Sequence, residues 1–330
     1  MMRLLVIGDE ARFRKYTPDL PIVSQVESVV VDRGTPDDEI ISRVPDADFI
    51  VADAISPVSK TLMDAFPSLK LIHSEGVAYN AIDVAEAKSK AIFTCNNAGV
   101  NAGAVAEQAV LLMLACLRHL VPGNAAVLEG RQILMKERLM VEGIRELGDC
   151  KVGLVGFGAI ANQTAKRLRA FGSDVYYWNR NRKPNELEEE YEVHYLPLDE
   201  LARTCDIISV HVAVTPETTN LIDARFLELM KDDAILINTA RGEIVDQVAL
   251  AAALEQGSIG GAGLDTLSPE PVSVDHPLTQ LSDQAASKLV LSPHIGGVTE
   301  GMFRRAWTTI WLNVERVAKG ERPVNVVNGL

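Results

Sequence analysis

One glycine-rich turn in this sequence has the spacing that suits a dinucleotide pyrophosphate. The apolar run 152–155 leads into Gly156 and Gly158, and an amphipathic stretch follows at 159–171. Gly156 permits a tight turn, Gly158 lets the backbone approach a phosphate, and Ala161 allows a helix to pack close to a strand. The N-terminus of such a helix attracts an anion. The residues expected at the pyrophosphate are Gly156, Phe157, Gly158, Ala159 and Ile160.

The next expected strand, 175–178, ends without the Asp or Glu that commonly binds an adenosine ribose. It runs instead into Asn179, Arg180, Asn181, Arg182 and Lys183. A guanidinium can bind a 2′-phosphate through paired hydrogen bonds, whereas a carboxylate would repel it. We therefore expect NADP(H) to be favoured over NAD(H), with Asn179, Arg180 and Arg182 at the ribose. In the alternative interpretation these arginines are only solvated.

Three loops in the second half each follow a short apolar run and each carry one reactive side chain. These side chains are Arg241, Glu270 and His294. Loops at the carboxyl ends of parallel strands converge on one crevice. There a guanidinium can clamp a carboxylate, an imidazole can exchange a proton near neutral pH, and a carboxylate can orient that imidazole.

Short apolar runs alternate with amphipathic stretches along the whole chain. This alternation predicts α/β architecture, with two doubly wound parallel sheets in two lobes and a cleft between them. The expected strands are 3–7, 26–31, 48–52, 69–73, 91–94, 152–155, 175–178, 206–211, 234–238, 261–265 and 289–292. The expected helices are 59–66, 83–89, 101–120, 159–171 and 299–319, the third ended by Pro122 and Gly123. Residues 122–150 show no clear period.

Composition excludes several classes of protein. The chain has 330 residues, 47% of them hydrophobic, and a formal net charge of −13, which disfavours broad binding to nucleic acid. Its longest apolar run, 109–117, is far shorter than the ~20 residues that cross a bilayer. The N-terminus suits a first strand better than a secretory signal. Four scattered cysteines favour reduced thiols over a metal cluster, so we expect a cytoplasmic protein that binds no metal and no membrane.

Taken in order, these motifs resemble those of the D-isomer-specific 2-hydroxyacid dehydrogenase family over nearly the whole chain. Segments 76–83, 105–107 and 211–218 add to the resemblance. It implies a Rossmann dinucleotide-binding domain at 102–297 and a flavodoxin-like substrate domain at 1–101 and 298–330. The implied reaction transfers a hydride between NADP(H) or NAD(H) and a small 2-oxo or D-2-hydroxy acid.

The resemblance also implies roles for single residues. Arg241 would clamp the substrate carboxylate, His294 would act as general acid and base, and Glu270 would orient His294. The backbone of Gly76, Val77 and Ala78 would bind the substrate carboxylate. The further cofactor contacts implied are His211, Thr215, Thr239, Ala240, Arg241, Asp265, His294 and Gly296. Asp265 could instead cap a helix or turn.

Two departures from the family bear on the substrate. Ala78 stands where the family commonly has a second glycine, which leaves the pair of backbone donors open. Relatives that handle phosphoglycerate carry arginine near 53–56 and 73–75, where this chain has none. Asp53 and Glu75 are expected to repel a second anionic group, so a non-phosphorylated substrate is predicted.

Other activities occur on the same fold. Formate dehydrogenases place glutamine where Glu270 stands, which ranks that activity lower. A dinucleotide-sensing protein, like the corepressors of this fold, would bind cofactor with little turnover. The family is usually dimeric through the long helix of its nucleotide-binding domain. The apolar repeat from Val105 to Cys116 suits that interface and equally suits an internal core helix.

Overall fold

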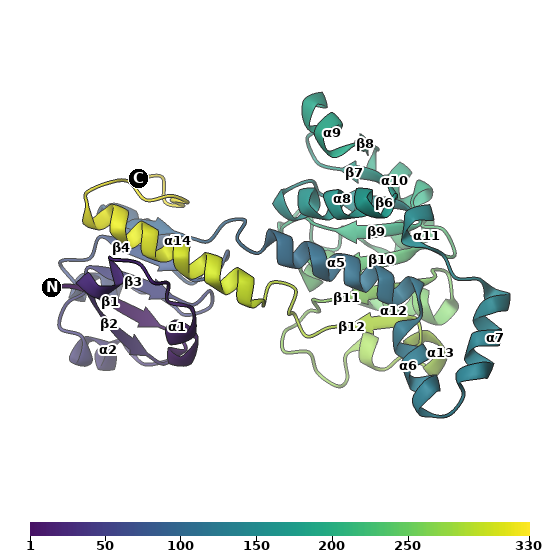
Figure 1. The fold of residues 1–330 in the computed structure, drawn as a ribbon, viewed down its shortest axis with the longest axis horizontal. Helices are drawn as coiled ribbons and strands as arrows, with labels where there is room; N and C mark the ends of the chain where they lie inside the picture. The colour runs from purple at the N-terminus through teal and green to yellow at the C-terminus, as the bar shows by residue number, and fades with distance from the viewer. The chain divides into compact units, whose positions relative to one another are not determined.

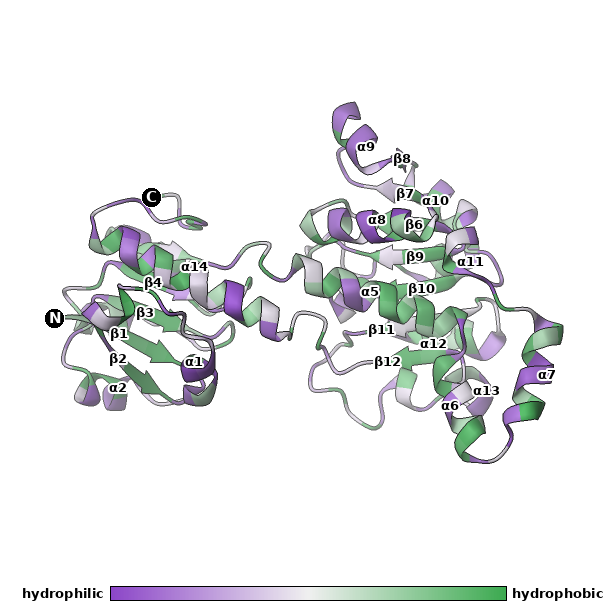
Figure 2. Cartoon of the chain, viewed as in Figure 1, coloured by the Kyte–Doolittle hydropathy of each residue, from purple (hydrophilic) through white to green (hydrophobic).

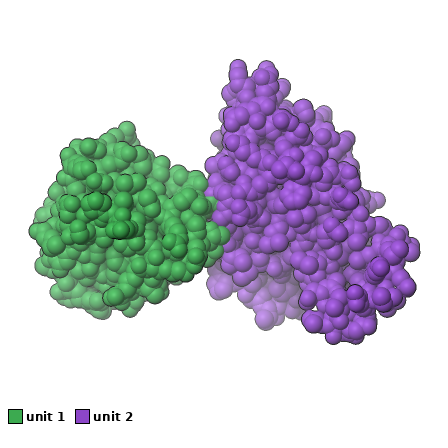
Figure 3. Space-filling view, in the orientation of Figure 1, with its two compact units in different colours: residues 1–101, 298–330 green, residues 102–297 purple.

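The computed structural model describes residues 1–330, which divide into two compact units (Figure 3). Unit 1 comprises Met1–Asn101 and Val298–Leu330, and unit 2 comprises Ala102–Gly297. Each unit contains one parallel sheet between two layers of helices (Figure 1). The predicted fold class, α/β with two parallel sheets, is confirmed.

Unit 1 has a five-stranded sheet in the order β2-β1-β3-β4-β5, with all neighbours parallel. Its strands are β1 (Met2–Ile7), β2 (Val26–Val31), β3 (Phe49–Ala52), β4 (Leu71–Ser74) and β5 (Phe93–Cys95). This is the flavodoxin-like order, in which the direction of winding reverses between β1 and β3. The loops after those two strands therefore lie side by side at the carboxyl edge of the sheet.

Helices cover both faces of this sheet because its strands are apolar on both sides. They are α1 (Glu10–Tyr16), α2 (Asp37–Arg43), α3 (Lys60–Ala65), α4 (Val84–Ser89) and α14 (Glu300–Ala318). Leu5 and Ile7 pack under α2, α3 and α4, while Leu4 and Val6 pack with Trp307 of α14. Alternate residues of one strand thus enter two separate cores.

Unit 2 has a seven-stranded parallel sheet in the order β12-β11-β10-β9-β6-β7-β8. The strands are β6 (Lys151–Val155), β7 (Asp174–Trp178), β8 (Val193–Tyr195), β9 (Ile207–Val210), β10 (Ile235–Asn238), β11 (Gly261–Leu264) and β12 (Leu289–Leu291). Winding reverses between β6 and β9, which is where a Rossmann-type sheet binds its ligand.

The helices of unit 2 cover both faces of its sheet, apart from two that belong to neither core. They are α5 (Ala102–Leu117), α6 (Leu120–Leu128), α7 (Gln132–Glu142), α8 (Ala159–Phe171), α9 (Asn185–Tyr191), α10 (Leu198–Thr204), α11 (Ala224–Leu229), α12 (Gln247–Gln256) and α13 (Asp283–Ala286). Helices α5 and α8 pack on one face of the sheet, α10, α11 and α12 pack on the other, and α6 and α7 belong to neither core. Strand β8 and most of the short helices had no clear signal in the sequence.

The prediction for the end of the long helix is wrong. Helix α5 ends at Leu117, and His119 takes a left-handed conformation with φ 47° before α6 starts. Pro122 lies in the first turn of α6, where its missing N–H removes no hydrogen bond. Residues 122–150, which show no period in the sequence, form most of α6 and all of α7. Pro122 therefore starts a second helix instead of only ending the first.

No single helix has both the length and the apolar composition needed to cross a bilayer, and α5 with α6, bent by 57°, would meet that test only as a pair.

His73 on β4 is fully buried, and its two ring nitrogens have different partners. Nδ1 donates to the Ser74 carbonyl at 2.8 Å, and Nε2 accepts from the Asn313 amide of α14 at 3.1 Å. Burial lowers the pKa of His73 from 6.5 to about 4. The folded chain therefore keeps this imidazole neutral in a pH range where the unfolded chain protonates it.

We predict that His73 makes the protein less stable in acid. Because the unfolded state binds the extra proton, stability falls as pH drops from about 6.5 to about 4, by about 3 kcal/mol at most. In His73→Asn, urea denaturation at pH 7, 5.5 and 4.5 should show a weaker pH dependence than in the wild type. The exposed His194→Asn is the control, and equal slopes in the wild type and His73→Asn would contradict the prediction.

Candidate active site

The glycine-rich turn of unit 2 lies at the point where winding reverses between β6 and β9. Gly156 has φ +99°, and a Cβ built there would lie 2.8 Å from the His211 carbonyl oxygen. Only glycine suits that conformation and that space. Gly158 precedes α8 without a side-chain cap, and a Cβ built on it would meet nothing within 4 Å. The first N–H groups of α8 therefore face open space that an anion can enter.

The side chains around this turn suit an uncharged, polar part of a ligand. Burial lowers the pKa of His211 to about 4, and its Nε2 lies 2.9 Å from the Ser209 hydroxyl. The hydroxyl of Thr239 is buried and has no hydrogen-bond partner in the protein. Thr215 lies in the turn after β9 and Ala240 in the turn after β10. An unpartnered buried hydroxyl after β10 and an uncapped helix N-terminus after β6 are both features that a bound dinucleotide can use.

The loop after β7 is partly neutralised by a carboxylate that the sequence analysis did not connect with it. Glu188 of α9 accepts hydrogen bonds from Arg182 at 2.8 and 2.9 Å and from the Tyr177 hydroxyl at 2.5 Å. Asn179 instead accepts from the Phe157 N–H at 3.3 Å. Arg180 is exposed and forms no ion pair. Of the two predicted arginines, only Arg180 is therefore free of a carboxylate partner.

Glu270 and His294 are in direct contact. The Nδ1 atom of His294 lies 2.9 and 3.0 Å from the two Glu270 carboxylate oxygens. Both side chains are partly exposed, at 41% for His294 and 46% for Glu270. Because the carboxylate only accepts, Nδ1 carries the proton in this contact and Nε2 is the nitrogen left for a ligand.

The backbone that carries His294 is held by a buried carboxylate. His294 has a left-handed conformation with φ +55°. Asp265, which follows β11, accepts from the Ser292 hydroxyl at 2.5 Å, the Ile295 N–H at 3.0 Å and the Gly296 N–H at 2.8 Å. Neither a helix nor its own turn takes up these bonds, so Asp265 acts as the brace of the His294 loop.

Two residues outside the predicted set complete these braces. The Gln108 amide of α5 donates to the Ser292 hydroxyl at 2.8 Å. Asn238, the last residue of β10, donates to the Arg241 carbonyl at 2.8 Å and accepts from the Ala240 N–H at 2.9 Å. No local pattern separates these amides from surface ones. Only their partners in the fold show what they do.

Arg241 is exposed, and one of its N–H groups donates to the Ala240 carbonyl at 2.6 Å. Its other guanidinium N–H groups donate to no protein acceptor. A Cβ on the next residue, Gly242, would overlap the backbone of Leu267 and Ser268. The Arg241 turn therefore adjoins the loop that leads to Glu270. The structure thus places Glu270 and His294 in direct contact and the Arg241 turn against the start of the loop that carries Glu270.

In unit 1, the predicted anion loop follows β4. The Gly76 N–H donates to the Ser74 hydroxyl at 3.2 Å, so Gly76 itself is not a free donor. The N–H groups of Val77 and Ala78 donate to no protein acceptor. Asn96 holds the loop by donating to the Val77 carbonyl at 2.7 Å. Of the three predicted backbone donors, Val77 and Ala78 are therefore the two whose N–H groups have no acceptor in the protein.

The expected repulsion from Asp53 and Glu75 is wrong, because both carboxylates are paired. Arg33 lies 2.6 Å from Asp53, and Arg12 lies 2.6 Å from Glu75. Burial raises the pKa of Glu75 against the effect of Arg12. For Asp53 burial acts in the same upward direction, but hydrogen bonds from Ser56 and Arg33 outweigh it and lower the pKa. The arginines come from other segments of unit 1, so the local sequence does not show them.

Comparison with known proteins agrees with this geometry. Residues 110–296 match the family described as "D-isomer specific 2-hydroxyacid dehydrogenase, NAD binding domain". A glyoxylate reductase of Thermococcus litoralis is 38% identical over 292 residues, which cover 88% of this chain and 86% of that protein.

Solved structures resemble the chain over nearly its full length. D-lactate dehydrogenase with NAD+ from Lactobacillus jensenii has a TM-score of 0.82 at 26% identity, covering 99% of each chain. An NADPH-dependent glyoxylate/hydroxypyruvate reductase from Sinorhizobium meliloti, in complex with NADP and malonate, has a TM-score of 0.76 at 28% identity and covers 99% of this chain and 96% of its own.

The fold and site therefore define an NAD-binding oxidoreductase with a Rossmann-type domain. The chain belongs to the D-isomer-specific 2-hydroxyacid dehydrogenase family.

Proposed function

We propose that this enzyme reduces a small 2-oxo acid to the D-2-hydroxy acid, with His294 as general acid and Glu270 as its partner. The observation that carries the proposal is the contact of Glu270 with Nδ1 of His294, because it leaves Nε2 for the substrate oxygen. The named activities of the relatives, glyoxylate reductase and glyoxylate/hydroxypyruvate reductase, support the substrate class.

When bound, the nicotinamide of the cofactor supplies the hydride. The residues proposed to hold the cofactor are Gly156, Phe157, Gly158, Ala159, Ile160, Asn179, Arg180, Arg182, His211, Thr215, Thr239, Ala240, Arg241, Asp265, His294 and Gly296. Arg182 is expected to contribute less to cofactor binding than Arg180, since its guanidinium already donates two hydrogen bonds to Glu188.

Residues of the chain itself transfer the proton and bind the substrate carboxylate. Nε2–H of His294 donates its proton to the ketone oxygen as that oxygen gains negative charge, and in the reverse direction Nε2 accepts the hydroxyl proton. Glu270 stabilises the imidazolium and holds the ring in one tautomer. The free N–H groups of Arg241 suit the substrate carboxylate. The N–H groups of Val77 and Ala78 are further donors of the type a carboxylate binds.

We propose that the substrate carries no phosphate, on grounds other than repulsion. Arg12 and Arg33, the two arginines near the β1 and β3 ends in unit 1, are each already bonded to a carboxylate. A phosphate would have to displace Asp53 or Glu75 to bind them. Glyoxylate, hydroxypyruvate and larger aliphatic or aromatic 2-oxo acids remain in the proposed class.

We predict that His294→Ala lowers kcat for 2-oxo acid reduction by about a hundredfold or more, because no other group donates the proton. The kcat is measured as the rate of cofactor oxidation with a panel of 2-oxo acids. The substitution His194→Ala, at an exposed histidine, is the matched control and should leave kcat unchanged. Normal turnover in His294→Ala would remove His294 from the mechanism. Cofactor binding with negligible turnover on every acid in the wild type would favour a dinucleotide-sensing protein instead.

We propose that NADP(H) is the preferred cofactor and NAD(H) the second. Support comes from Arg180, which is exposed and unpaired after β7, and from the absence of a carboxylate at the strand end. Structures with NADP and with NAD+ both occur among the similar proteins. The similar proteins therefore leave both cofactors open, and the proposal rests on the loop after β7.

We predict that Arg180→Ala lowers kcat/KM with NADPH about tenfold and leaves NADH nearly unchanged, as expected for a lost charge-assisted hydrogen bond. Glu188→Gln should raise kcat/KM with NADPH, because it frees Arg182 from its ion pair. Lys183→Ala is the matched control for lost positive charge. A wild-type preference for NADH would contradict the assignment.

We propose that the protein works in the cytoplasm as a homodimer. Four cysteines without disulfides suit a reducing compartment. Helix α7 has no buried residue, yet it carries exposed Ile133, Leu134, Met140 and Val141. Hydropathic colouring shows green on both α6 and α7 (Figure 2). Exposed apolar side chains gathered on two neighbouring helices suit an interface.

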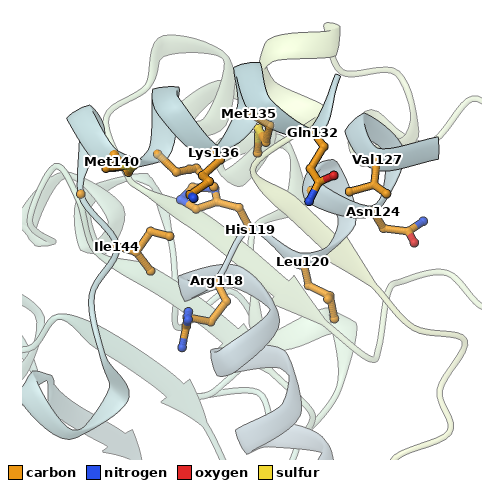
Figure 4. A pocket seen from close by; sticks show the side chains of 13 residues that line it. Arg118, His119, Leu120, Asn124, Val127, Gln132, Met135, Lys136, Met140 and Ile144 are labelled. Atoms are coloured by element: carbon orange, nitrogen blue, oxygen red, sulfur yellow. The ribbon is translucent and has the colours of Figure 1, made fainter. Parts of the chain in front are cut away.

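Helices α6 and α7 also border a cavity of about 710 Å³. Leu120, Val127, Met135, Met140 and Ile144 point into or around it (Figure 4). A second copy of the same two helices would present matching apolar side chains to this cavity, as expected for a twofold interface. The α6–α7 segment is thus the proposed dimer contact, in place of α5, ten of whose residues are buried within the monomer.

We predict that the double substitution Ile133→Glu and Val141→Glu converts a dimer into a monomer, because it places charge in an apolar interface. Sedimentation velocity measures the mass. The exposed Val248→Glu on α12 is the control and should leave the dimer intact. A monomeric wild type, or a dimer that survives both substitutions, would contradict the interface.

A further inference from the structure

Glu270 stands on an exposed loop and has one partner in the protein, His294. Residues 269–275 are all exposed, so packing does not hold this segment in place. Hydrogen bonds from Thr279 and Gln280 to the carbonyls of Ser273 and Val274 hold its second half near His276. The position of Glu270, in the first half, is set by His294 and by the places where the loop leaves the body of unit 2. Those places are Ser268 at one end and His276 at the other.

The Gln247 side chain holds Ser268 by a pair of hydrogen bonds like those between neighbouring strands. The Gln247 amide nitrogen donates to the Ser268 carbonyl at 2.9 Å, and the Gln247 carbonyl oxygen accepts from the Ser268 N–H at 3.1 Å. Gln247 is the first residue of α12, so its backbone is fixed by the helix. Both backbone polar groups of Ser268 are thus bonded to one amide, which determines the position and the direction of the chain.

His276, at the other end of the loop, is hydrogen-bonded to the same Ser268 carbonyl. The Leu278 N–H donates to Nδ1 of His276 at 3.2 Å, which leaves the proton on Nε2. Nε2 lies 3.2 Å from the Ser268 carbonyl and donates to it. His276 is 6% exposed, in contrast to the loop that it closes. The Ser268 carbonyl therefore joins Gln247 and His276 in one clamp.

The clamp also adjoins the Arg241 turn. Gly242 approaches Leu267 and Ser268 so closely that no Cβ fits between the two backbones. The start of the Glu270 loop is therefore confined between the Arg241 turn on one side and Gln247 on the other. Movement at Ser268 would be passed on to Glu270, two residues further along the chain.

We propose that Gln247 is a positioning residue for catalysis: together with His276 it clamps Ser268 and so holds Glu270 against Nδ1 of His294. This inference rests on the proposed function of the Glu270–His294 pair. A displaced carboxylate no longer stabilises the imidazolium or holds its ring, so proton transfer slows while cofactor binding is preserved. No contact of Gln247 with substrate or cofactor is needed.

The test is a double-mutant cycle between Gln247→Leu and Glu270→Gln. We expect Gln247→Leu to lower kcat about tenfold, with the dissociation constant for cofactor, measured by fluorescence titration, changed less than twofold. In the Glu270→Gln background, Gln247→Leu should lower kcat less than twofold further, because its effect passes through Glu270. The same substitution at the other end of α12, Gln256→Leu, is the matched control and should leave kcat unchanged.

A second variant and a measurement independent of turnover distinguish a loss of positioning from a loss of folding. Gln247→Glu keeps the acceptor for the Ser268 N–H but loses the donor to the Ser268 carbonyl. Its kcat should therefore lie between those of the wild type and Gln247→Leu. Nitrogen-15 NMR of His294 in the cofactor-free enzyme should show a weakened Nδ1–H hydrogen bond in both variants and an unchanged one in Gln256→Leu.

Two results would overturn the inference without touching the proposed function: unchanged kcat in Gln247→Leu, or a full tenfold loss in the Glu270→Gln background as well. If Glu270→Gln alone leaves kcat unchanged, the proposed Glu270–His294 pair itself fails, and the clamp has no catalytic role.

Discussion

Both faces of each parallel sheet are buried under helices, and this constraint determines where chemistry can take place. The strands consist mostly of apolar residues that enter one core or the other, and the polar side chains along them, such as those of His73 and Ser209, are buried with hydrogen-bond partners. Reactive groups remain only at the loop edges, where strands end and backbone N–H groups are free. In unit 2 the glycine-rich turn, the Arg241 turn, Asp265 and the His294 loop all follow strands of one sheet. Their proximity results from parallel pairing.

Burial explains why these loops are not merely close but held in place. Asp265 is buried with three hydrogen bonds from the His294 loop, which gives that loop a carboxylate anchor inside the protein. Gln247 anchors the Glu270 loop in a similar way with an amide. Each anchor leaves the side chain of His294 or Glu270 partly exposed while fixing the backbone beneath it. An exposed imidazole and carboxylate can thus keep a defined geometry without being buried themselves.

Charge partners from distant segments changed the interpretation of several predicted residues. Glu188 occupies Arg182, and Arg12 and Arg33 occupy Glu75 and Asp53. In each case the sequence shows an isolated charge, whereas the fold shows an ion pair with little net field. The electrostatic field at these loops therefore depends on which charges remain free, such as that of Arg180, and not on how many occur in a segment.

Periodicity, glycine spacing and motif order were enough to indicate the α/β class, most strands within one or two residues and the glycine-rich turn, and they led to the prediction that Arg241, Glu270 and His294 are the reactive residues. Those features are local, because strand pattern, turn chemistry and helix start depend on neighbouring residues. The sequence could not show that Pro122 starts α6, that Gly76 donates to Ser74, or that Gln108, Asn238 and Gln247 brace the site. These facts depend on partners many residues away, and only the packing of sheets and helices decides which amides, carboxylates and guanidinium groups meet.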